Sequence, residues 1–433
     1  MNAQNFILKG GICYCNAGGA FKTVEGGLLV CTGGRSSGVY SAGELPEKYR
    51  AFPVRDYSGK LVIPGLVDLH MHAPQYAFRG MGMDLELLEW LNTRAFPEEA
   101  KYADSGYARS AYSTLVRDLR KGPNTRVLLF STVHVPASLL LMDLLEESGL
   151  VTLVGKVNMD RNCPEYLREH DAAASLEATE KWLGAAAKAG YKNTGAILTP
   201  RFIPSCSDDL MRGLAVLRKK YGFPLQSHLS ENRRECQWVR ELCPGSPGYA
   251  GAYAQWDLLE RSVMAHCVYS DDDEIRLLAG EGVFVAHCPQ SNTNLSSGIA
   301  PVRRLLDSGV HTGLGSDVAG GAHVSIFRAM TDAIQVSKLR HMLFAPGEAP
   351  LSMEEAFYLG TAGGGAFFGS GSFEDGCELD ALVMDDSDLA APFPLSLRDR
   401  LERVIYLSDD RNITAKYVRG TLIMENTQEL CLS

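Results

Sequence analysis

The order of strand-like and helix-like segments constrains the fold of this chain more than any other feature. From Val62 onward, short apolar runs alternate with longer amphipathic stretches, which is typical of strand–helix units around a parallel sheet. The predicted strands are Leu61–His70, Arg126–Val133, Val151–Val157, Gly195–Thr199, Phe223–His228, Ser262–His266, Val283–His287 and Val310–Gly315. The helical patterns between them include Ala137–Ser148, Ala172–Ala189, Ser207–Tyr221, Asn232–Leu242, Asp271–Ala279 and Pro301–Asp307. A strand–helix unit repeated about eight times is what a TIM-type (β/α) barrel requires, so we expect an α/β fold of this kind.

The two ends of the chain differ from this central region. Residues 5–60 are rich in glycine and contain brief β-like runs such as Gly27–Cys31, without helical periodicity. After a helical pattern at Met353–Ala366, further strands are predicted at Ala381–Met384, Arg403–Tyr406, Ala415–Val418 and Thr421–Met424. Because chain termini are commonly close together, both ends could form one small β-sandwich domain. The predicted organisation is residues 1–62 and 371–433 in the sandwich, and residues 63–370 in the catalytic barrel.

Composition argues against several classes of function. The formal charge is −10, and no Lys or Arg run is longer than pairs such as Lys219-Lys220, whereas binding to nucleic acid needs clustered cations. No stretch approaches the roughly 18 apolar residues of a membrane span, and the N-terminus lacks the features of a signal peptide. The 11 cysteines are an odd number scattered over the chain, which suits a reducing compartment. We expect a cytoplasmic protein with a small-molecule substrate and no nucleic-acid or membrane partner.

A His-x-His motif closes the first predicted strand of the barrel. Residues i and i+2 of a strand point to the same side, so His70 and His72 face one spot. Two histidines near a strand end are often only polar rim residues, but this geometry also favours a metal ion.

Three further polar residues follow other predicted strands of the barrel. His228 closes the fifth strand, His266 closes the sixth, and Asp317 follows the eighth. The carboxyl ends of barrel strands converge on one mouth, so these residues are expected to become neighbours around one ion. Imidazoles with one carboxylate suit zinc, with ferrous iron as the alternative. His134 and His287 also follow strands, and either a supporting role around the metal or a structural role is open for them.

Glu231 lies three residues after His228, where the chain leaves a strand and begins a helix. Such a glutamate could simply favour the N-terminus of the helix. Alternatively, it could act as a general base that takes a proton from metal-bound water and delivers it to a ring nitrogen of the substrate.

The motifs around these residues carry a resemblance that covers nearly the whole chain. The run PGLVDLHMH at residues 64–72 resembles the signature of the amidohydrolase superfamily. Its continuation is similar to the guanine deaminase family within that superfamily. The supporting segments are APQYAF at 73–78, LLEWL at 87–91, Phe96-Pro97, VGKVNMD at 154–160, TPRF at 199–202, QSHLSEN at 226–232, AHCPQSN at 286–292, DVAGG at 317–321 and YLSDDRN at 406–412.

The resemblance implies a role for each matching residue. It assigns the metal ligands to His70, His72, His228 and Asp317, with His266 orienting the attacking water and Glu231 as proton shuttle. It assigns substrate binding to the polar pair Gln75 and Arg201 and to the aromatic side chain of Phe202. His228 is also assigned to substrate binding, beside them. Lys156 invites comparison with the carbamylated lysine of binuclear amidohydrolases, but its surroundings match the mononuclear deaminases, which implies one metal ion per chain.

The activity implied by the resemblance is hydrolysis of guanine to xanthine and ammonia in purine catabolism. A hydroxide on the metal would attack the ring carbon that bears the exocyclic amine, with Glu231, His266 and Asp317 as the catalytic residues. Alternatives are deamination of another aminated heterocycle such as 8-oxoguanine, a pterin or a triazine, and hydrolysis of a cyclic amide. A non-catalytic scaffold is disfavoured because every proposed ligand is present. The resemblance also implies a homodimer.

Overall fold

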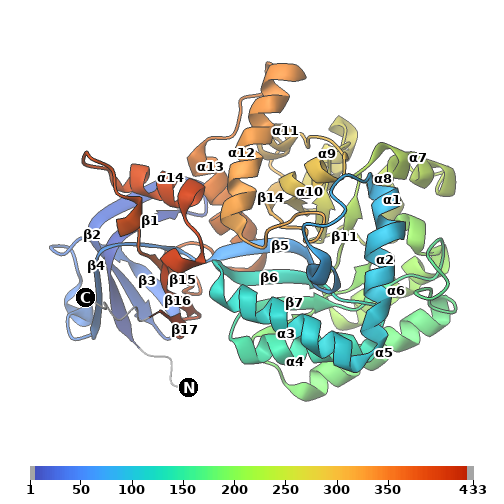
Figure 1. Ribbon diagram of the computed structural model, residues 1–433, viewed down its shortest axis with the longest axis horizontal. Helices are drawn as coiled ribbons and strands as arrows, with labels where there is room; N and C mark the ends of the chain where they lie inside the picture. The colour runs from blue at the N-terminus through green and yellow to red at the C-terminus, as the bar shows by residue number, and fades with distance from the viewer. Residues whose placement is uncertain (1–4, 427–433) are drawn as a thin grey trace.

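The computed structural model describes residues 5–426 and consists of two parts that lie side by side (Figure 1). A β-rich part contains both chain ends, and a larger part contains α-helices around parallel strands. Within residues 5–426 no helix combines the length and the apolar character needed to cross a membrane.

The strands of the larger part form two four-stranded parallel sheets. The first has the order β5-β6-β7-β9, and the second has the order β11-β12-β13-β14. The first sheet and a short pair beside it contain β5 (Leu66–His72), β6 (Asn124–Phe130), β7 (Val151–Gly155), β8 (Val157–Asn158), β9 (Thr194–Ala196) and β10 (Thr199–Pro200). The second contains β11 (Gln226–Leu229), β12 (Val263–His266), β13 (Phe284–His287) and β14 (His311–Leu314).

The two sheets face each other around a shared apolar core. Val67 and Leu69 of β5 belong to the same buried cluster as Ala265 of β12 and Ala286 of β13. A parallel bridge between Leu198 and Leu225 joins the sheets at one edge. At the other edge, the backbone N–H of Asp317 donates to the carbonyl of His70 over 2.9 Å. This α/β arrangement is consistent with a TIM-type barrel, although the ladders do not form one closed sheet.

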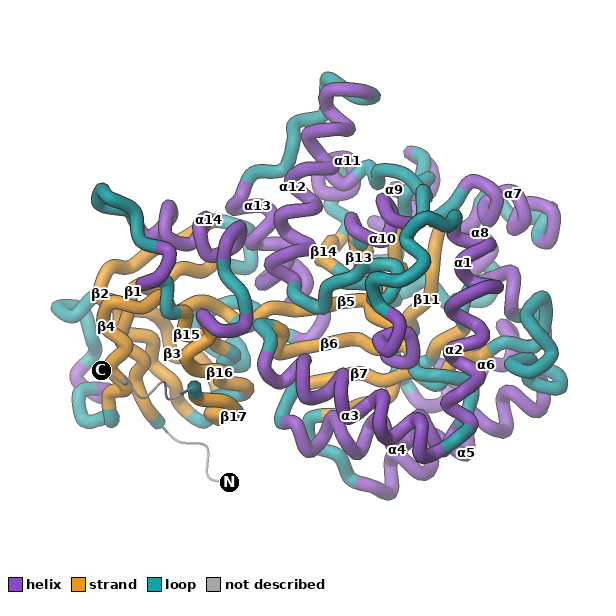
Figure 2. The backbone as a smooth tube through the Cα atoms, in the orientation of Figure 1, coloured by secondary structure: helices purple, strands orange, loops and turns teal. Residues whose placement is uncertain are grey.

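Helices cover the outside of these strands, as Figure 2 shows. They are α3 (Ser105–Lys121), α4 (Val135–Ser148), α5 (Ala172–Ala189), α6 (Asp208–Tyr221), α7 (Arg233–Leu242), α8 (Tyr249–Ala254), α9 (Asp272–Gly280), α10 (Pro289–Asn294), α11 (Val302–Asp307), α12 (Ile326–Leu343) and α13 (Met353–Tyr358). Between β5 and α3, the chain forms η2 (Ala73–Phe78), α1 (Leu87–Trp90), the π-helical turn η3 (Leu91–Ala95) and α2 (Phe96–Ala100).

The β-rich part joins both ends of the chain in one seven-stranded sheet of order β17-β16-β15-β4-β1-β2-β3. Its strands are β1 (Phe6–Cys15), β2 (Phe21–Thr32), β3 (Arg35–Tyr40), β4 (Val54–Pro64), β15 (Ala381–Met384), β16 (Ile413–Val418) and β17 (Thr421–Glu425). The central pairing is antiparallel between β4 and β15, so the expected association of the two ends is present. A single sheet does not confirm the predicted sandwich.

One predicted strand is wrong. Arg403–Tyr406 lies inside the helix α14 (Leu397–Leu407). Apolar side chains at Leu397, Leu401, Val404 and Ile405 are buried, which is the spacing of one helical face. A capping box at Ser396 begins the helix, so local sequence and burial both favour it over a strand.

Buried charges link the sheet of the β-rich part to the larger part. The Arg126 guanidinium on β6 contacts the Asp380 carboxylate at 2.6 Å and the Glu378 carboxylate at 2.9 Å. The Nζ atom of Lys416 on β16 donates to the carbonyls of Leu119 and Asn124 over 3.0 and 3.1 Å. Because an unpaired buried charge is costly, these contacts fix how the two parts meet.

Candidate active site

Four histidines and one aspartate meet at the carboxyl ends of the strands of the larger part. His70 and His72 end β5, His228 lies in β11, His266 ends β12, and Asp317 follows β14. Asp317 Oδ1 lies 3.1 Å from His70 Nε2 and 3.6 Å from His72 Nε2, and Asp317 Oδ2 lies 3.8 Å from His266 Nε2. The structure therefore brings together all five residues that the sequence pattern predicts at one spot.

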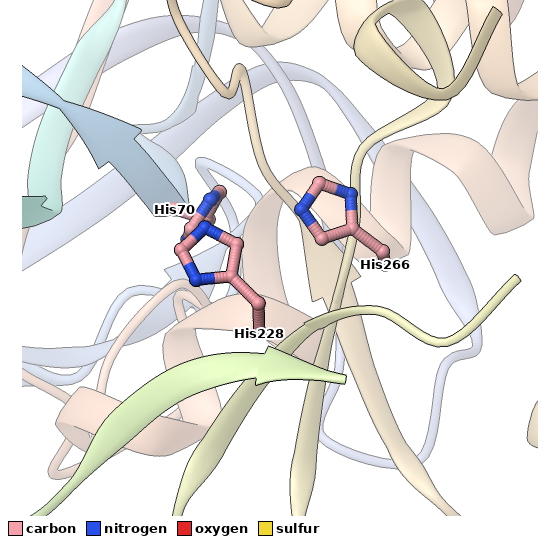
Figure 3. Close-up of side chains that lie close together, drawn as sticks. All are labelled: His70, His228 and His266. Carbon is pink, nitrogen blue, oxygen red and sulfur yellow. The ribbon is translucent and has the colours of Figure 1, made fainter. Parts of the chain in front are cut away.

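The donor atoms of this cluster suit a metal ion. The rings of His70, His228 and His266 converge in Figure 3, and their nitrogens fall within 4.8 Å of one another, as do the donors of His70, His72 and Asp317. The Nε2 atoms of His72 and His228 face each other at 3.0 Å, and the buried Nε2 of His266 has no hydrogen-bond partner among the described residues. Several nitrogens aimed at one point are typical of a binding site for a cation.

In two of the histidine rings, the Nδ1 atom contacts a residue outside the cluster. His228 Nδ1 lies 2.5 Å from the carbonyl oxygen of Arg201, so this nitrogen carries the proton and donates it. His266 Nδ1 lies 2.9 Å from Oδ1 of Asn292. Such outer contacts fix the tautomer and leave each Nε2 with a free lone pair that points into the cluster.

Burial determines the protonation of the cluster. It lowers the pKa of His70 and lowers those of His72 and His228 well below the usual value, because the charged imidazolium loses its hydration. Burial also acts to raise the pKa of Asp317, but the neighbouring histidines outweigh it and hold this pKa at about 2. Neutral imidazoles beside an ionised carboxylate are the protonation states that bind a metal.

Glu231 lies beside the cluster, and its pKa is shifted upwards, whereas that of Asp317 is shifted downwards. Its Oε2 is 3.4 Å from His266 Nε2, and its Oε1 accepts a hydrogen bond from Ser297 over 3.2 Å. Burial, followed by the charge of Asp317, raises the pKa of the Glu231 carboxyl to about 8. A carboxyl group poised near neutrality can both take up and release a proton.

The turn that carries Glu231 is fixed by the following helix. Ser230 has a positive φ of 48°, and α7 begins with a capping box between Asn232 and Glu235. Oε2 of Glu235 accepts the backbone N–H groups of Glu231 and Asn232 over 3.2 Å each, while Tyr249 donates to its Oε1 over 2.5 Å. Asn232 and Glu235 cap the N-terminus of α7, so this helix does not need Glu231 to begin.

The predicted substrate-binding residues also line this site. The Arg201 guanidinium contacts both carboxylate oxygens of Glu99, at 2.6 and 3.0 Å. The Gln75 side chain donates from Nε2 to Glu99 over 2.8 Å and accepts the backbone N–H of Ala319 at Oε1 over 3.2 Å. Phe202 follows Arg201 and is buried.

A single cavity joins the histidine cluster to these residues. It is lined by His72, Gln75, Leu87, Trp90, Leu91, Arg201, Phe202, His228, Glu231, Glu235, His266, Leu295 and Asp317. No sequence pattern pointed to a role for Glu99, for Glu235 or for the apolar wall that α1 and η3 contribute. Only the family resemblance of the LLEWL and Phe96-Pro97 segments marked that region.

Three other polar residues considered from the sequence lie outside the cluster. The buried Lys156 ammonium pairs with Glu169. His287 is fully buried and neither ring nitrogen has a hydrogen-bond partner among residues 5–426, and burial lowers its pKa to about 4. His134 follows β6, and its pKa is lowered by burial and by the charge of Lys156.

Comparison with known proteins places this chain in a family. The model of the amidohydrolase family matches residues 61–423, and the chain belongs to this family. Among curated relatives, a guanine deaminase of Dictyostelium discoideum is 38% identical over 86% of this chain and 84% of its own length. A guanine deaminase of Escherichia coli strain K12 is 34% identical over 94% of this chain and 93% of its own length.

A solved structure extends the comparison to three dimensions. The crystal structure of guanine deaminase from C. acetobutylicum, which has guanine bound in its active site, shares 43% sequence identity with this chain. The TM-score is 0.93, and the match covers 97% of this chain and 100% of that one.

Proposed function

We propose that this protein is a guanine deaminase that converts guanine and water into xanthine and ammonia in purine catabolism. The observation that carries the proposal is a single cavity lined both by the histidine–aspartate cluster with Glu231 and by Arg201 and Gln75. Relatives at 34–38% identity over most of the chain are guanine deaminases, which supports the same substrate.

The proposed metal ligands are His70, His72, His228 and Asp317, which would hold one zinc ion, with ferrous iron as the alternative. When bound, the metal supplies Lewis acidity and lowers the pKa of water. The pairing of Lys156 with Glu169 supports a mononuclear site, because the ammonium of this lysine is already engaged by a carboxylate.

The residues around the ligands would move the protons. Glu231 would accept a proton from the attacking water and deliver it to the ring nitrogen next to the carbon that bears the amine. His266, 3.4 Å from Glu231, would orient the water towards that carbon. The exocyclic NH2 group would then leave as ammonia after gaining the remaining proton of the attacking water, whose oxygen becomes the new ring carbonyl, so one water is consumed for each guanine.

Substrate recognition would rest on further residues that line the same cavity. Arg201 and Gln75 would hold the polar edge of guanine, with Phe202 as an aromatic wall and His228 beside the ring. An N–H of Arg201 would donate to the ring carbonyl of guanine, which adenine replaces with a donor amine. Two donors that face each other lose a hydrogen bond, and sites built on such contacts discriminate by about 10⁴-fold.

Ammonia release from guanine, adenine, 8-oxoguanine, a pterin, a triazine and a cyclic amide tests the proposal. We expect guanine to have the highest kcat/KM, and adenine to be refused. Substitution of Arg201→Met should lower the guanine to adenine ratio of kcat/KM while metal content stays the same. Equal turnover of adenine, or a ratio that Arg201→Met leaves unchanged, would reduce the assignment to an unspecified aminated heterocycle.

The proposal extends to the organisation of the whole molecule. We infer a TIM-type barrel at residues 63–370 and a β-sandwich built from residues 1–62 and 371–433, of which residues 1–4 and 427–433 lie outside the described part of the chain. All ten cysteines among the described residues are free, which supports a cytoplasmic location. The proposed partners are a purine substrate and a second copy of the chain, with no nucleic acid or membrane.

A further inference from the structure

Glu99 lies directly behind the proposed substrate-binding pair. It belongs to α2, between the apolar wall and α3, and 1% of its surface is exposed. Its carboxylate is bound by both terminal nitrogens of Arg201 and by Nε2 of Gln75. Arg201 and Gln75 line the cavity, whereas Glu99 does not, so the carboxylate acts on the cavity only through these two side chains.

We propose that Glu99 is a positioning residue that sets both the charge and the hydrogen-bond polarity of the purine pocket. The inference rests on the proposed roles of Arg201 and Gln75 in binding guanine. It has two parts, one for each partner of the carboxylate.

The first part concerns charge. Arg201 is 2% exposed, and an isolated buried guanidinium would attract anions into the cavity. The bidentate contact with Glu99 compensates this charge and still leaves N–H groups of the guanidinium free to donate. A compensated arginine suits a neutral base such as guanine better than an anionic ligand.

The second part concerns the side-chain amide of Gln75. The ionised Glu99 carboxylate can only accept hydrogen bonds, so Nε2 of Gln75 must face it. The backbone N–H of Ala319 can only donate, so Oε1 of Gln75 must face that group. The two contacts agree on one orientation of the amide. Gln75 therefore presents a fixed pattern to the substrate and cannot flip to match a ligand with the opposite pattern.

The neighbouring Glu98 provides a matched control. It belongs to the same turn of α2 and is also buried, but its carboxylate binds Tyr107 and the Lys101 ammonium and has no contact with the cavity. Glu98→Gln and Glu99→Gln each remove one buried negative charge from one helix. Only the second change touches Arg201 and Gln75.

The experiment measures kcat and KM for guanine together with inhibition by xanthine, at a pH where xanthine, a more acidic purine than guanine, is largely anionic. In Glu99→Gln we expect KM to rise by about tenfold or more, with a smaller change in kcat, because the new amide forces two donors to face each other. The inhibition constant of xanthine should fall relative to the KM for guanine, because no carboxylate then compensates the positive charge of Arg201. Glu98→Gln should change neither quantity beyond about twofold.

Two further variants keep the test decisive if Glu99→Gln folds poorly. Glu99→Asp retains the negative charge but shortens the reach, so KM should rise while the relative inhibition by xanthine stays at the wild-type level. The double variant Glu99→Gln with Arg201→Met should be more stable to heat than Arg201→Met alone, because it does not leave a buried carboxylate without a partner.

The inference would be overturned if Glu98→Gln and Glu99→Gln changed KM and the relative inhibition by xanthine equally. Stronger relative inhibition by xanthine in Glu99→Asp than in the wild type would also overturn it. So would a double variant that is no more stable than Arg201→Met. If the wild-type protein fails to deaminate guanine, the proposed function itself is wrong. If it deaminates guanine and Glu99→Gln does so with an unchanged KM, only the role of Glu99 is wrong.

Discussion

Burial of a carboxyl group gives Glu231 a chemical property that an exposed glutamate lacks. Its pKa of about 8 arises first from burial and then from the charge of Asp317, 86 positions further along the chain in the same cavity. The positive charge of a bound metal would favour the ionised form, so the two influences oppose each other. A proton on this group is then held weakly enough to be passed on.

We expect Glu231→Gln to lower turnover of guanine by about 10²-fold or more, because the amide preserves the shape of the side chain but cannot accept a proton from water. Metal content by elemental analysis should stay at about one equivalent per chain, since Glu231 is not among the proposed ligands. Retention of more than about a tenth of the wild-type rate would contradict the shuttle role.

At the residue scale, the sequence predicts those groups whose positions follow from strand ends. His70 and His228 lie in the last residues of β5 and β11 and Asp317 follows β14, so their convergence needs only the fold class. Glu99 could not be found in this way, because two successive glutamates in a helix are typical of a solvated face. Its burial depends on the contact with Arg201, 102 positions away, which only the tertiary structure shows.

At the scale of elements, the start of α7 connects helix stability to the site. Glu235 completes the capping box of this helix and also holds the backbone N–H of Glu231. Burial and then the charge of Glu231 raise its pKa to about 7. A structural cap and the position of the proposed proton shuttle therefore depend on one side chain.

We expect Glu235→Ala to destabilise the protein by about 1–3 kcal/mol, because it leaves buried N–H and hydroxyl groups without their acceptor. Turnover of guanine should fall by roughly tenfold or more, since Glu231 loses the contact that fixes its backbone. Thermal unfolding and steady-state kinetics measure the two effects.

Asp399→Ala is the control for Glu235→Ala. It removes the same kind of capping box at the start of α14, far along the chain from the site. A small drop in melting temperature without loss of turnover is expected. If Asp399→Ala lowered turnover as much as Glu235→Ala, the effect would be one of general stability.

Element prediction succeeded where periodicity and local signals agree. The helix Ala172–Ala189 and the strand Ala381–Met384 have the predicted bounds. The predicted strand Leu61–His70 is instead two strands, β4 and β5, separated at Gly65, where an added Cβ would lie 2.2 Å from the Thr125 side chain. A continuous apolar run hides this division because the end of β4, residues 61–64, and all of β5 are buried. No change of polarity therefore marks the point where the chain passes from one sheet to the other.

At the scale of the whole molecule, the two parts are joined through groups that belong to both. Lys416 on β16 is fully buried and donates to carbonyls at the end of α3 and the start of β6. Its ordinary pKa is near 10.5, and burial lowers it to about 7, opposed by the charge of Asp410. No pattern in the sequence distinguishes this lysine from an exposed one on an alternating strand.

The shifted pKa of Lys416 predicts how stability depends on pH. Between pH 7 and the ordinary pKa, the unfolded chain keeps the proton on this lysine and the folded protein has released it. The unfolded state then binds more protons, so the free energy of unfolding rises with pH by up to about 1.4 kcal/mol per unit. Chemical denaturation of the wild type and of Lys416→Met at pH 7, 8 and 9 isolates this contribution, because the other titrating groups are common to both proteins. The wild type should gain stability relative to the variant at each step. Parallel stabilities over this range would mean that Lys416 stays charged in the folded protein and that the junction between the two parts contains a solvated ammonium.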